Sequence, residues 1–193
     1  RVLSGVIAAG LAFLLIASSV YRKNLKFIYE PWRMTHGLLS VLTLALSLVH
    51  IFQVNHYTAM PLQRALWVVL PLLWLALIVY ARGIKPAAML KKPYELKEVR
   101  AERNGSWTLA VAPVGHPGLS FRPGQFAWLA VQRSPFDVRQ HPFSFSSSAE
   151  HKGWLEFTVK ELGDFTRTVK DIPAGARLYV DGPYGTFGPD FHP

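Results

Sequence analysis

The sequence of residues 32–54 is WRMTHGLLSVLTLALSLVHIFQV, and this stretch decides the fold class of the first half of the chain. It carries one formal charge, at Arg33, and it exceeds the about 20 apolar residues that an α-helix needs to cross a bilayer. Comparable apolar runs lie at about 2–21 and 62–82. The sequence therefore predicts that residues 1–90 supply three transmembrane helices of a membrane α-helical bundle.

The composition narrows the chemistry that these residues can support. The 193 residues include no cysteine, which excludes disulfides, thiolate catalysis and cysteine-ligated iron–sulfur clusters within this sequence. The formal net charge is +9, but much of the positive charge flanks the apolar runs, and no basic stripe or nucleic-acid motif stands out. We therefore expect contact with a lipid bilayer and not with nucleic acid.

Basic residues are distributed unevenly between the loops beside the apolar runs. The loop after the first run and the tail of the third run carry four each: Arg22, Lys23, Lys26 and Arg33, and then Arg82, Lys85, Lys91 and Lys92. The loop between the second and third runs has only Arg64. The positive-inside rule then places the first loop and everything after residue 82 in the cytoplasm. This predicts a multi-pass membrane protein with a cytoplasmic C-terminal domain.

Two histidines, His36 and His50, lie within the second apolar run. They are 14 residues apart, which is about 40° short of four helical turns and roughly 21 Å along the axis. Both imidazoles should share one helix face, one towards each side of the membrane, as two stacked haems require. Arg33 could then pair with a haem propionate, and Gly37 could leave room for the macrocycle. The alternative is that each histidine is an interfacial or buried residue bonded to a neighbouring helix.

After about Pro93 the pattern changes to short alternating segments separated by turn residues. We expect strands at 95–100, 106–112, 125–132, 143–147, 154–160 and 177–180, and a helix that begins near Asp164. Asn104-Gly105, between the first two strands, is a typical hairpin turn. Six short strands and one helix predict a small antiparallel β-barrel over residues 94–193.

One four-residue motif in this domain is specific enough to suggest a family. His141-Pro142-Phe143-Ser144 follows a loop and opens a strand, and it resembles the flavin motif of the ferredoxin–NADP reductase family in the form found in NADPH oxidases and ferric reductases. The stretch Tyr29–His36 is also similar to the start of the haem-bearing fifth helix of those proteins. The resemblance covers essentially the whole chain, and it implies three of six family helices followed by a barrel that binds FAD.

The resemblance implies a role for each residue of the motif. Phe143 would pack against the isoalloxazine, Ser144 would hydrogen-bond near flavin N5, and His141 would approach the pyrophosphate or the ribityl chain. Pro142 would stiffen the backbone between them. The alternative is an edge-strand proline with ordinary barrel packing.

A second segment looks like the other half of the flavin site. Val159 and Lys160 end a strand, and Gly163-Asp164-Phe165-Thr166 then opens a helix; the four residues are similar to the family's Gly-Asp-Trp-Thr, with Phe165 replacing Trp. The helix N-terminus and Lys160 would hold the pyrophosphate. The alternative is a plain Asp N-cap after a glycine turn. The stretches 122–126 and Gly182–Gly185 also resemble the family's strand entry and closing turn.

Together these features predict a flavohaem oxidoreductase that moves electrons across a membrane. NAD(P)H would reduce FAD, and two haems b, at His36 and His50, would pass electrons to dioxygen, ferric iron or a periplasmic partner; no side chain needs to act as a catalytic acid, base or nucleophile. Each iron needs a second ligand from another helix or chain, and NAD(P)H needs a domain or reductase partner outside this sequence, which we expect to be a fragment. The alternatives are a membrane-anchored flavin reductase without haem and a non-catalytic subunit with a vestigial flavin barrel.

Overall fold

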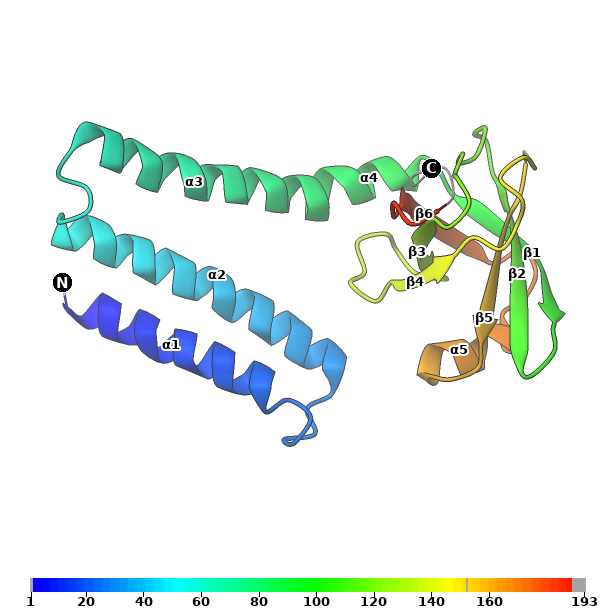
Figure 1. The fold of residues 1–193 in the computed structure, drawn as a ribbon, viewed down its shortest axis with the longest axis horizontal. Helices are drawn as coiled ribbons and strands as arrows, with labels where there is room; N and C mark the ends of the chain where they lie inside the picture. Colours follow the sequence, from blue (N-terminus) through cyan, green and yellow to red (C-terminus); the bar gives the residue numbers. More distant parts are fainter. Residues whose placement is uncertain (1, 152, 189–193) are drawn as a thin grey trace. The chain divides into compact units, whose positions relative to one another are not determined.

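The computed structural model describes residues 2–151 and 153–188, and its course is shown in Figure 1. Packing divides the chain into two compact units with the boundary between Leu77 and Ile78. This boundary lies earlier in the chain than the expected start of the barrel domain at residue 94, because the end of the third long helix packs with the strands. Each unit is described by itself.

The first unit is built from long helices. They are α1 (Val2–Val20), α2 (Tyr29–Val54) and α3 (Pro61–Val79). α1 and α2 pack side by side as an antiparallel hairpin, and Ser4 Oγ near the start of α1 donates to Gln53 Oε1 near the end of α2 at 3.0 Å. α2 begins at Tyr29, three residues before the expected start. Pro31 is tolerated there because a first helical turn does not need its missing N–H.

The third long helix does not stop at the expected residue 82. A π-helical turn, η1 (Tyr80–Ile84), leads directly into α4 (Lys85–Leu90), so helical backbone continues to Leu90. Pro86 lies in the first turn of α4, where proline is compatible with a helix. Arg82 and Lys85, expected in the tail after the third apolar run, are therefore at the end of that run and within a continuing helix.

Three helices of the described chain are long and apolar enough to cross a membrane: Val2–Val20, Pro31–Val54 and Pro61–Leu90. Large apolar side chains such as Phe13, Leu38 and Leu77 lie exposed along them. This matches the number of apolar helices that the sequence predicts. The agreement concerns the length and the apolar composition of these helices.

The second unit is a curled antiparallel sheet. Its strands are β1 (Tyr94–Ala101), β2 (Ser106–Pro113), β3 (Phe126–Val131), β4 (His141–Ser144), β5 (Leu155–Lys160) and β6 (Arg177–Tyr184), in the order β4-β3-β6-β1-β2-β5. The short helix α5 (Asp164–Thr168) and the 3-10 turn η2 (Val169–Asp171) follow β5. Ser146 N, just after β4, donates to Glu156 O of β5 at 2.8 Å, which brings the two edge strands together. The six-stranded curled sheet fits an FAD-binding barrel of the ferredoxin-reductase type.

The interior of the barrel follows from strand alternation. Leu96, Leu109, Leu129, Phe157 and Leu178 come from five different strands, and all are fully buried. A residue pointing inwards on each strand is what closes such a sheet around one core. The β-barrel predicted from the turn spacing is thus present, and its core positions the strands that carry the candidate site.

Two local predictions can be compared with the backbone directly. Asn104 and Gly105 adopt φ values of 57° and 67° between the antiparallel strands β1 and β2, so the predicted hairpin is confirmed. β4 begins at His141, earlier than the expected Phe143. Pro142 is accommodated because β4 is an edge strand of the sheet, where a residue without an N–H can pair on one side only.

Candidate functional site

The two segments that resemble the halves of a flavin site, His141–Ser144 and Gly163–Thr166, meet through an aromatic contact. The imidazole of His141 on β4 stacks on the ring of Phe165 on α5, with centroids 3.9 Å apart and planes 8° apart. Phe143 lies on the same side of β4, and its ring centroid is 6.1 Å from that of Phe165. Segments that are separated in sequence by β5 and its flanking loops therefore form one continuous wall. Phe165 keeps the aromatic character of the tryptophan that it replaces.

The alternation of β4 separates its four side chains into two sets. His141 and Phe143 are half-buried towards α5 and the core, while Pro142 and Ser144 are exposed. The Ser144 hydroxyl is thus accessible to a ligand lying over the strand. Lys160 at the end of β5 is also exposed, whereas Val159 is 2% exposed in the core and can reach a ligand only through its backbone.

The start of α5 is organised by a threonine. Thr166 Oγ1 accepts hydrogen bonds from Leu162 N at 3.0 Å and Gly163 N at 2.9 Å. Gly163 has extended backbone and is the N-cap, while Asp164 is the first helical residue. The alternative of an Asp N-cap therefore does not describe this turn, and Thr166 is a structural residue of the motif.

Two glycine turns come together at one end of the barrel. Gln125 Oε1 accepts from Arg122 N at 2.8 Å, and Gln125 Nε2 donates to Gly185 O at 3.1 Å. Gly124 has φ +86°, and a β-carbon there would lie 1.9 Å from Phe187 O. The strand entry and the closing turn, which the sequence suggested separately, form one packed structure that only glycine at residue 124 permits.

Two charged groups near this barrel were not anticipated from the sequence. Lys85 of α4 forms an ion pair with Asp181 of β6 at 2.8 Å, and Tyr184 Oη, which also contacts Lys85, donates to Asp181 Oδ1 at 2.6 Å. Burial raises the pKa of Tyr184, and the hydrogen bond to Asp181 adds to that shift. No local sequence signal links Lys85 to a strand so far along the chain, and its charge was assigned only to the membrane flank.

The loop before β4 holds a second charged cluster. Asp137 accepts hydrogen bonds from Arg139 Nη2 at 2.9 Å and from Arg133 Nη1 at 3.2 Å. The hydrogen bond from Arg139 holds the pKa of the Asp137 carboxyl well below its usual range. The cluster keeps a net positive charge two residues before His141, which suits a phosphate-bearing ligand.

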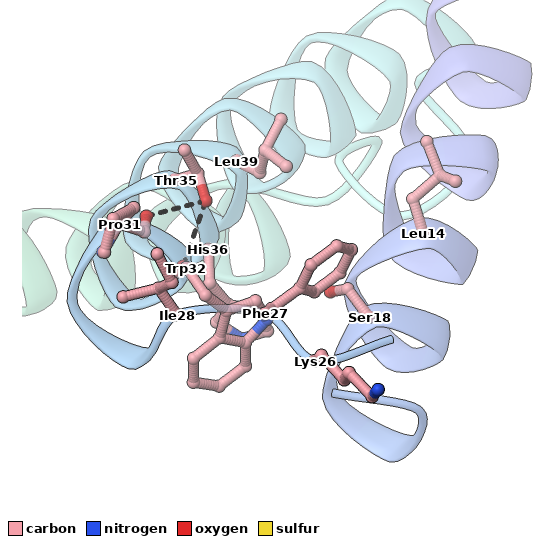
Figure 2. A pocket seen from close by; sticks show the side chains of 10 residues that line it. All are labelled: Leu14, Ser18, Lys26, Phe27, Ile28, Pro31, Trp32, Thr35, His36 and Leu39. Carbon is pink, nitrogen blue, oxygen red and sulfur yellow. Dashed lines mark hydrogen bonds between the residues drawn. The ribbon is translucent and has the colours of Figure 1, made fainter. Parts of the chain in front are cut away.

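In the helical unit, His36 faces a pocket between α1 and α2 (Figure 2). The pocket has a volume of about 610 Å³ and is lined by Leu14, Ser18, Lys26, Phe27, Ile28, Pro31, Trp32, Thr35, His36 and Leu39. His36 Nδ1 is buried and has no hydrogen-bond partner among the described residues. Arg33, expected at a haem propionate, is not among the residues that line this pocket. A mainly apolar cavity of this size with one buried imidazole nitrogen fits a haem bound at His36.

The imidazole of His50 occupies a different environment near the start of α1. A β-carbon on Gly5 would lie 2.7 Å from His50 Cε1 and 2.8 Å from both ring nitrogens. Because the His36 pocket also includes Leu14 and Ser18 of α1, both histidines lie on the α2 face that meets α1, as their spacing predicts. Residues 2–151 and 153–188 contain no cluster of three or more potential metal-ligating side chains.

Comparison with known proteins identifies the barrel. Residues 108–187 match a family described as FAD-binding domain, and this range contains both halves of the motif pair. The propane 2-monooxygenase reductase component of Rhodococcus jostii is 32% identical over 83 residues, which are 42% of this chain and 22% of that protein. A probable dihydroorotate dehydrogenase B (NAD(+)) electron transfer subunit of Methanocaldococcus jannaschii is 37% identical over 67 residues, or 35% of this chain and 22% of that protein.

Solved structures are also similar to part of this chain. The ferredoxin reductase in carbazole 1,9a-dioxygenase aligns with a TM-score of 0.43 and 28% identity, covering 51% of this chain and 30% of that one. The chain spans about a fifth of the length of the curated relatives it matches. Within this chain, residues 108–187 of the barrel match an FAD-binding domain.

Proposed function

We propose that this chain is part of a membrane-embedded flavohaem oxidoreductase of the ferric reductase and NADPH oxidase kind. Electrons from NAD(P)H pass through FAD and two haems to an acceptor on the far side of the membrane. The observation that carries the proposal is the setting of His36, whose imidazole lines an apolar pocket of about 610 Å³ in a helix apolar enough to span a bilayer. The same chain carries an FAD-binding domain, which makes a redox cofactor the natural occupant of that pocket.

On the flavin side, the residues of the barrel hold and orient the cofactor. When bound, FAD accepts a hydride and releases single electrons, chemistry that no side chain can supply. The stacked rings of His141 and Phe165 form an aromatic wall, and Phe143 extends it. The exposed Ser144 hydroxyl offers a hydrogen bond to the flavin ring, and Lys160 with the Gly163 turn offers a positive region to the pyrophosphate.

On the haem side, His36 and His50, on the same face of α2, would each hold one haem through the imidazole. Bound haem would carry single electrons, and the apolar lining of the pocket would exclude water and help set its potential. A second ligand for each iron would come from another helix or another chain. Between α1 and α2 the structure has an open pocket at His36, whereas the imidazole of His50 is packed tightly against Gly5.

The apolar helices and the distribution of charge support the proposed membrane location and orientation. Exposed apolar side chains on α1, α2 and α3 would face lipid. The basic loop that contains Arg22, Lys23 and Lys26 and the basic end of the third helix would lie on the cytoplasmic side with the FAD domain. Two relatives named as a reductase component and an electron transfer subunit favour a chain that hands electrons onward. Dioxygen, ferric iron and a periplasmic partner all suit an acceptor beyond the outer haem.

The test is the cofactor content of the purified full-length protein. We expect one FAD and two haems per chain. Each of the single variants His36→Leu and His50→Leu should lose about half of the Soret intensity of the parent while FAD stays bound. His151→Leu, an exposed histidine in the FAD domain, is the matched control and should keep both haems. Unchanged haem content in both membrane-helix variants would overturn the proposal.

Two other outcomes would identify the alternatives. FAD without a Soret band would indicate a membrane-anchored flavin reductase. A protein that retains neither FAD nor haem would indicate a non-catalytic subunit. The three results are separated by one absorbance spectrum and one measurement of released flavin.

A further inference from the structure

A second buried nitrogen lies beside His36 in the same pocket. Trp32 Nε1 is buried and, like His36 Nδ1, has no hydrogen-bond partner among the described residues. The two rings are neighbours on α2, with centroids 4.9 Å apart, and Figure 2 shows both at the lower end of the pocket. The pocket therefore concentrates two unpaired nitrogens in one place.

The indole nitrogen limits what can satisfy it. Indole N–H is a donor and never an acceptor, and leaving it buried without a partner is destabilising. No described residue accepts from this N–H, and the recorded hydrogen bonds of the two hydroxyls that line the pocket go to helix carbonyls: Ser18 to Leu15 O, and Thr35 to Pro31 O and Trp32 O, each at 3.0 Å. The missing acceptor is expected to come from the ligand.

The charge of the lining indicates what kind of acceptor it is. Among the residues that the structure describes, the pocket lining includes one cation, Lys26, and no carboxylate. A buried donor and a positive charge at the edge of an apolar cavity suit an apolar molecule that carries a carboxylate. Haem b has that composition, a flat apolar macrocycle with propionate groups at one edge.

The indole is also held in position from its other side. The Arg22 guanidinium lies over the Trp32 ring at 5.3 Å and over the Tyr29 ring at 5.1 Å. Such cation–π contacts fix the plane of the indole and hence the direction of its N–H. Ordering the donor before the ligand binds lowers the entropy cost of forming the hydrogen bond.

We propose that Trp32 is a positioning residue for the haem at His36, donating its indole N–H to a haem propionate while Lys26 supplies a charge partner. The inference rests on the proposed function, because it requires haem in the His36 pocket. It assigns to Trp32 a role distinct from ligation: the imidazole of His36 holds the iron, and the indole of Trp32 sets the rotation of the macrocycle within the pocket.

The first test replaces only the donor. Trp32→Phe keeps an aromatic ring and removes the N–H, and we expect haem to leave about tenfold faster to an excess of a haem-scavenging protein, as loss of an outer-shell hydrogen bond commonly does. We also expect the midpoint potential of one haem to shift. Trp107→Phe is the matched control, because Trp107 Nε1 is likewise buried without a partner among the described residues but lies on β2 of the FAD domain.

A second arm identifies the group that the indole contacts. Apoprotein is reconstituted with haem or with haem dimethyl ester, whose esterified propionates are weaker acceptors. We expect the ester to be released faster than haem from the parent protein but at a similar rate from Trp32→Phe, because the two changes remove one shared interaction. Strictly additive effects would overturn the assignment of the propionate.

The outcomes separate this inference from the function on which it rests. If His36→Leu keeps both haems, the proposed function fails. If His36→Leu loses a haem and Trp32→Phe matches the parent in release rate and potential, only the role of Trp32 fails. Retention of the haem assigned to His50, measured on the same samples, reports whether α1 and α2 of a variant are folded. Lys26→Met provides an independent weakening of the same carboxylate contact that leaves α2 intact.

Discussion

The imidazole of His50 on α2 lies directly against the backbone of Gly5 on α1, with so little space that an added β-carbon would be 2.7 Å from Cε1. Contacts this close require glycine on one of the two helices. The small residue lets α1 approach α2 and determines where the His50 ring can lie. A larger residue at position 5 is therefore expected to displace the His50 ring, although the residue at position 50 itself is not substituted.

Gly5→Ala is expected to displace the His50 ring or to push α1 away from α2. We predict loss of the haem assigned to His50, with the haem at His36 retained, measured by pyridine haemochrome content and the reduced-minus-oxidised spectrum. Gly10→Ala on the same helix is the control, since a β-carbon there meets nothing within 4 Å. Equal haem content in the two variants would contradict the prediction.

Removing the ring of Phe165 should weaken FAD binding more than it weakens the fold. Phe165→Ala deletes the stacking partner of His141, an interaction worth about 0.5–1.5 kcal/mol beyond area burial. We predict a rise in the FAD dissociation constant of about tenfold, measured by flavin fluorescence titration. Phe136→Ala, an exposed aromatic in the loop before β4, should leave FAD affinity unchanged, and Phe165→Trp should restore most of the binding.

Lys160 is expected to act on the cofactor and not on stability. Its side chain is exposed at the end of β5, so Lys160→Met should leave the free energy of unfolding within about 0.5 kcal/mol of the parent. FAD affinity should fall by about 1.5–3 kcal/mol, and the salt dependence of binding should decrease, because a charge-assisted phosphate contact is lost. Lys170→Met, equally exposed after α5, serves as the control; identical titrations for both lysines would argue against the phosphate role.

The ion pair between Lys85 and Asp181 is expected to stabilise the FAD domain. Lys85→Met leaves a mostly buried Asp181 carboxylate without its cation, and we predict a loss of about 1–3 kcal/mol in the free energy of unfolding by urea. The control is Lys97→Met, because the Lys97–Glu95 pair has the same 2.8 Å separation but is exposed, and exposed pairs contribute about 0–1 kcal/mol. Similar losses in both variants would show that burial of this pair has no effect.

The stability of the barrel should fall in alkaline solution because of Tyr94. Burial raises the pKa of Tyr94 from 10.0 to about 12, and its side chain is 3% exposed. The folded state keeps the phenolic proton that the unfolded state releases, so the stabilisation is complete below pH 10 and is lost as the pH rises towards 12. We predict that, between pH 10 and pH 12, the free energy of unfolding falls by about 1–3 kcal/mol less in Tyr94→Phe than in the parent. A parallel pH profile for parent and variant would refute the assignment.

The sequence alone determined most of the local structure. Apolar run lengths predicted three long helices, turn residues and alternation predicted six strands, and Asn104-Gly105 predicted the hairpin between β1 and β2. The spacing of His36 and His50 also predicted their common helix face. These features depend on neighbours within a few residues or on the fixed pitch of one helix, so their pattern is present in the sequence itself.

Only the tertiary structure decided which distant residues meet. The stacking of His141 on Phe165, the ion pair from Lys85 to Asp181 and the contact of Gly5 with His50 each join different elements. The unpaired nitrogens of Trp32 and His36 could not be recognised either, because burial depends on the loop and on α1 packed across from them. Such contacts are set by how whole strands and helices pack around their cores, and no periodicity along one segment encodes the partner that another segment brings.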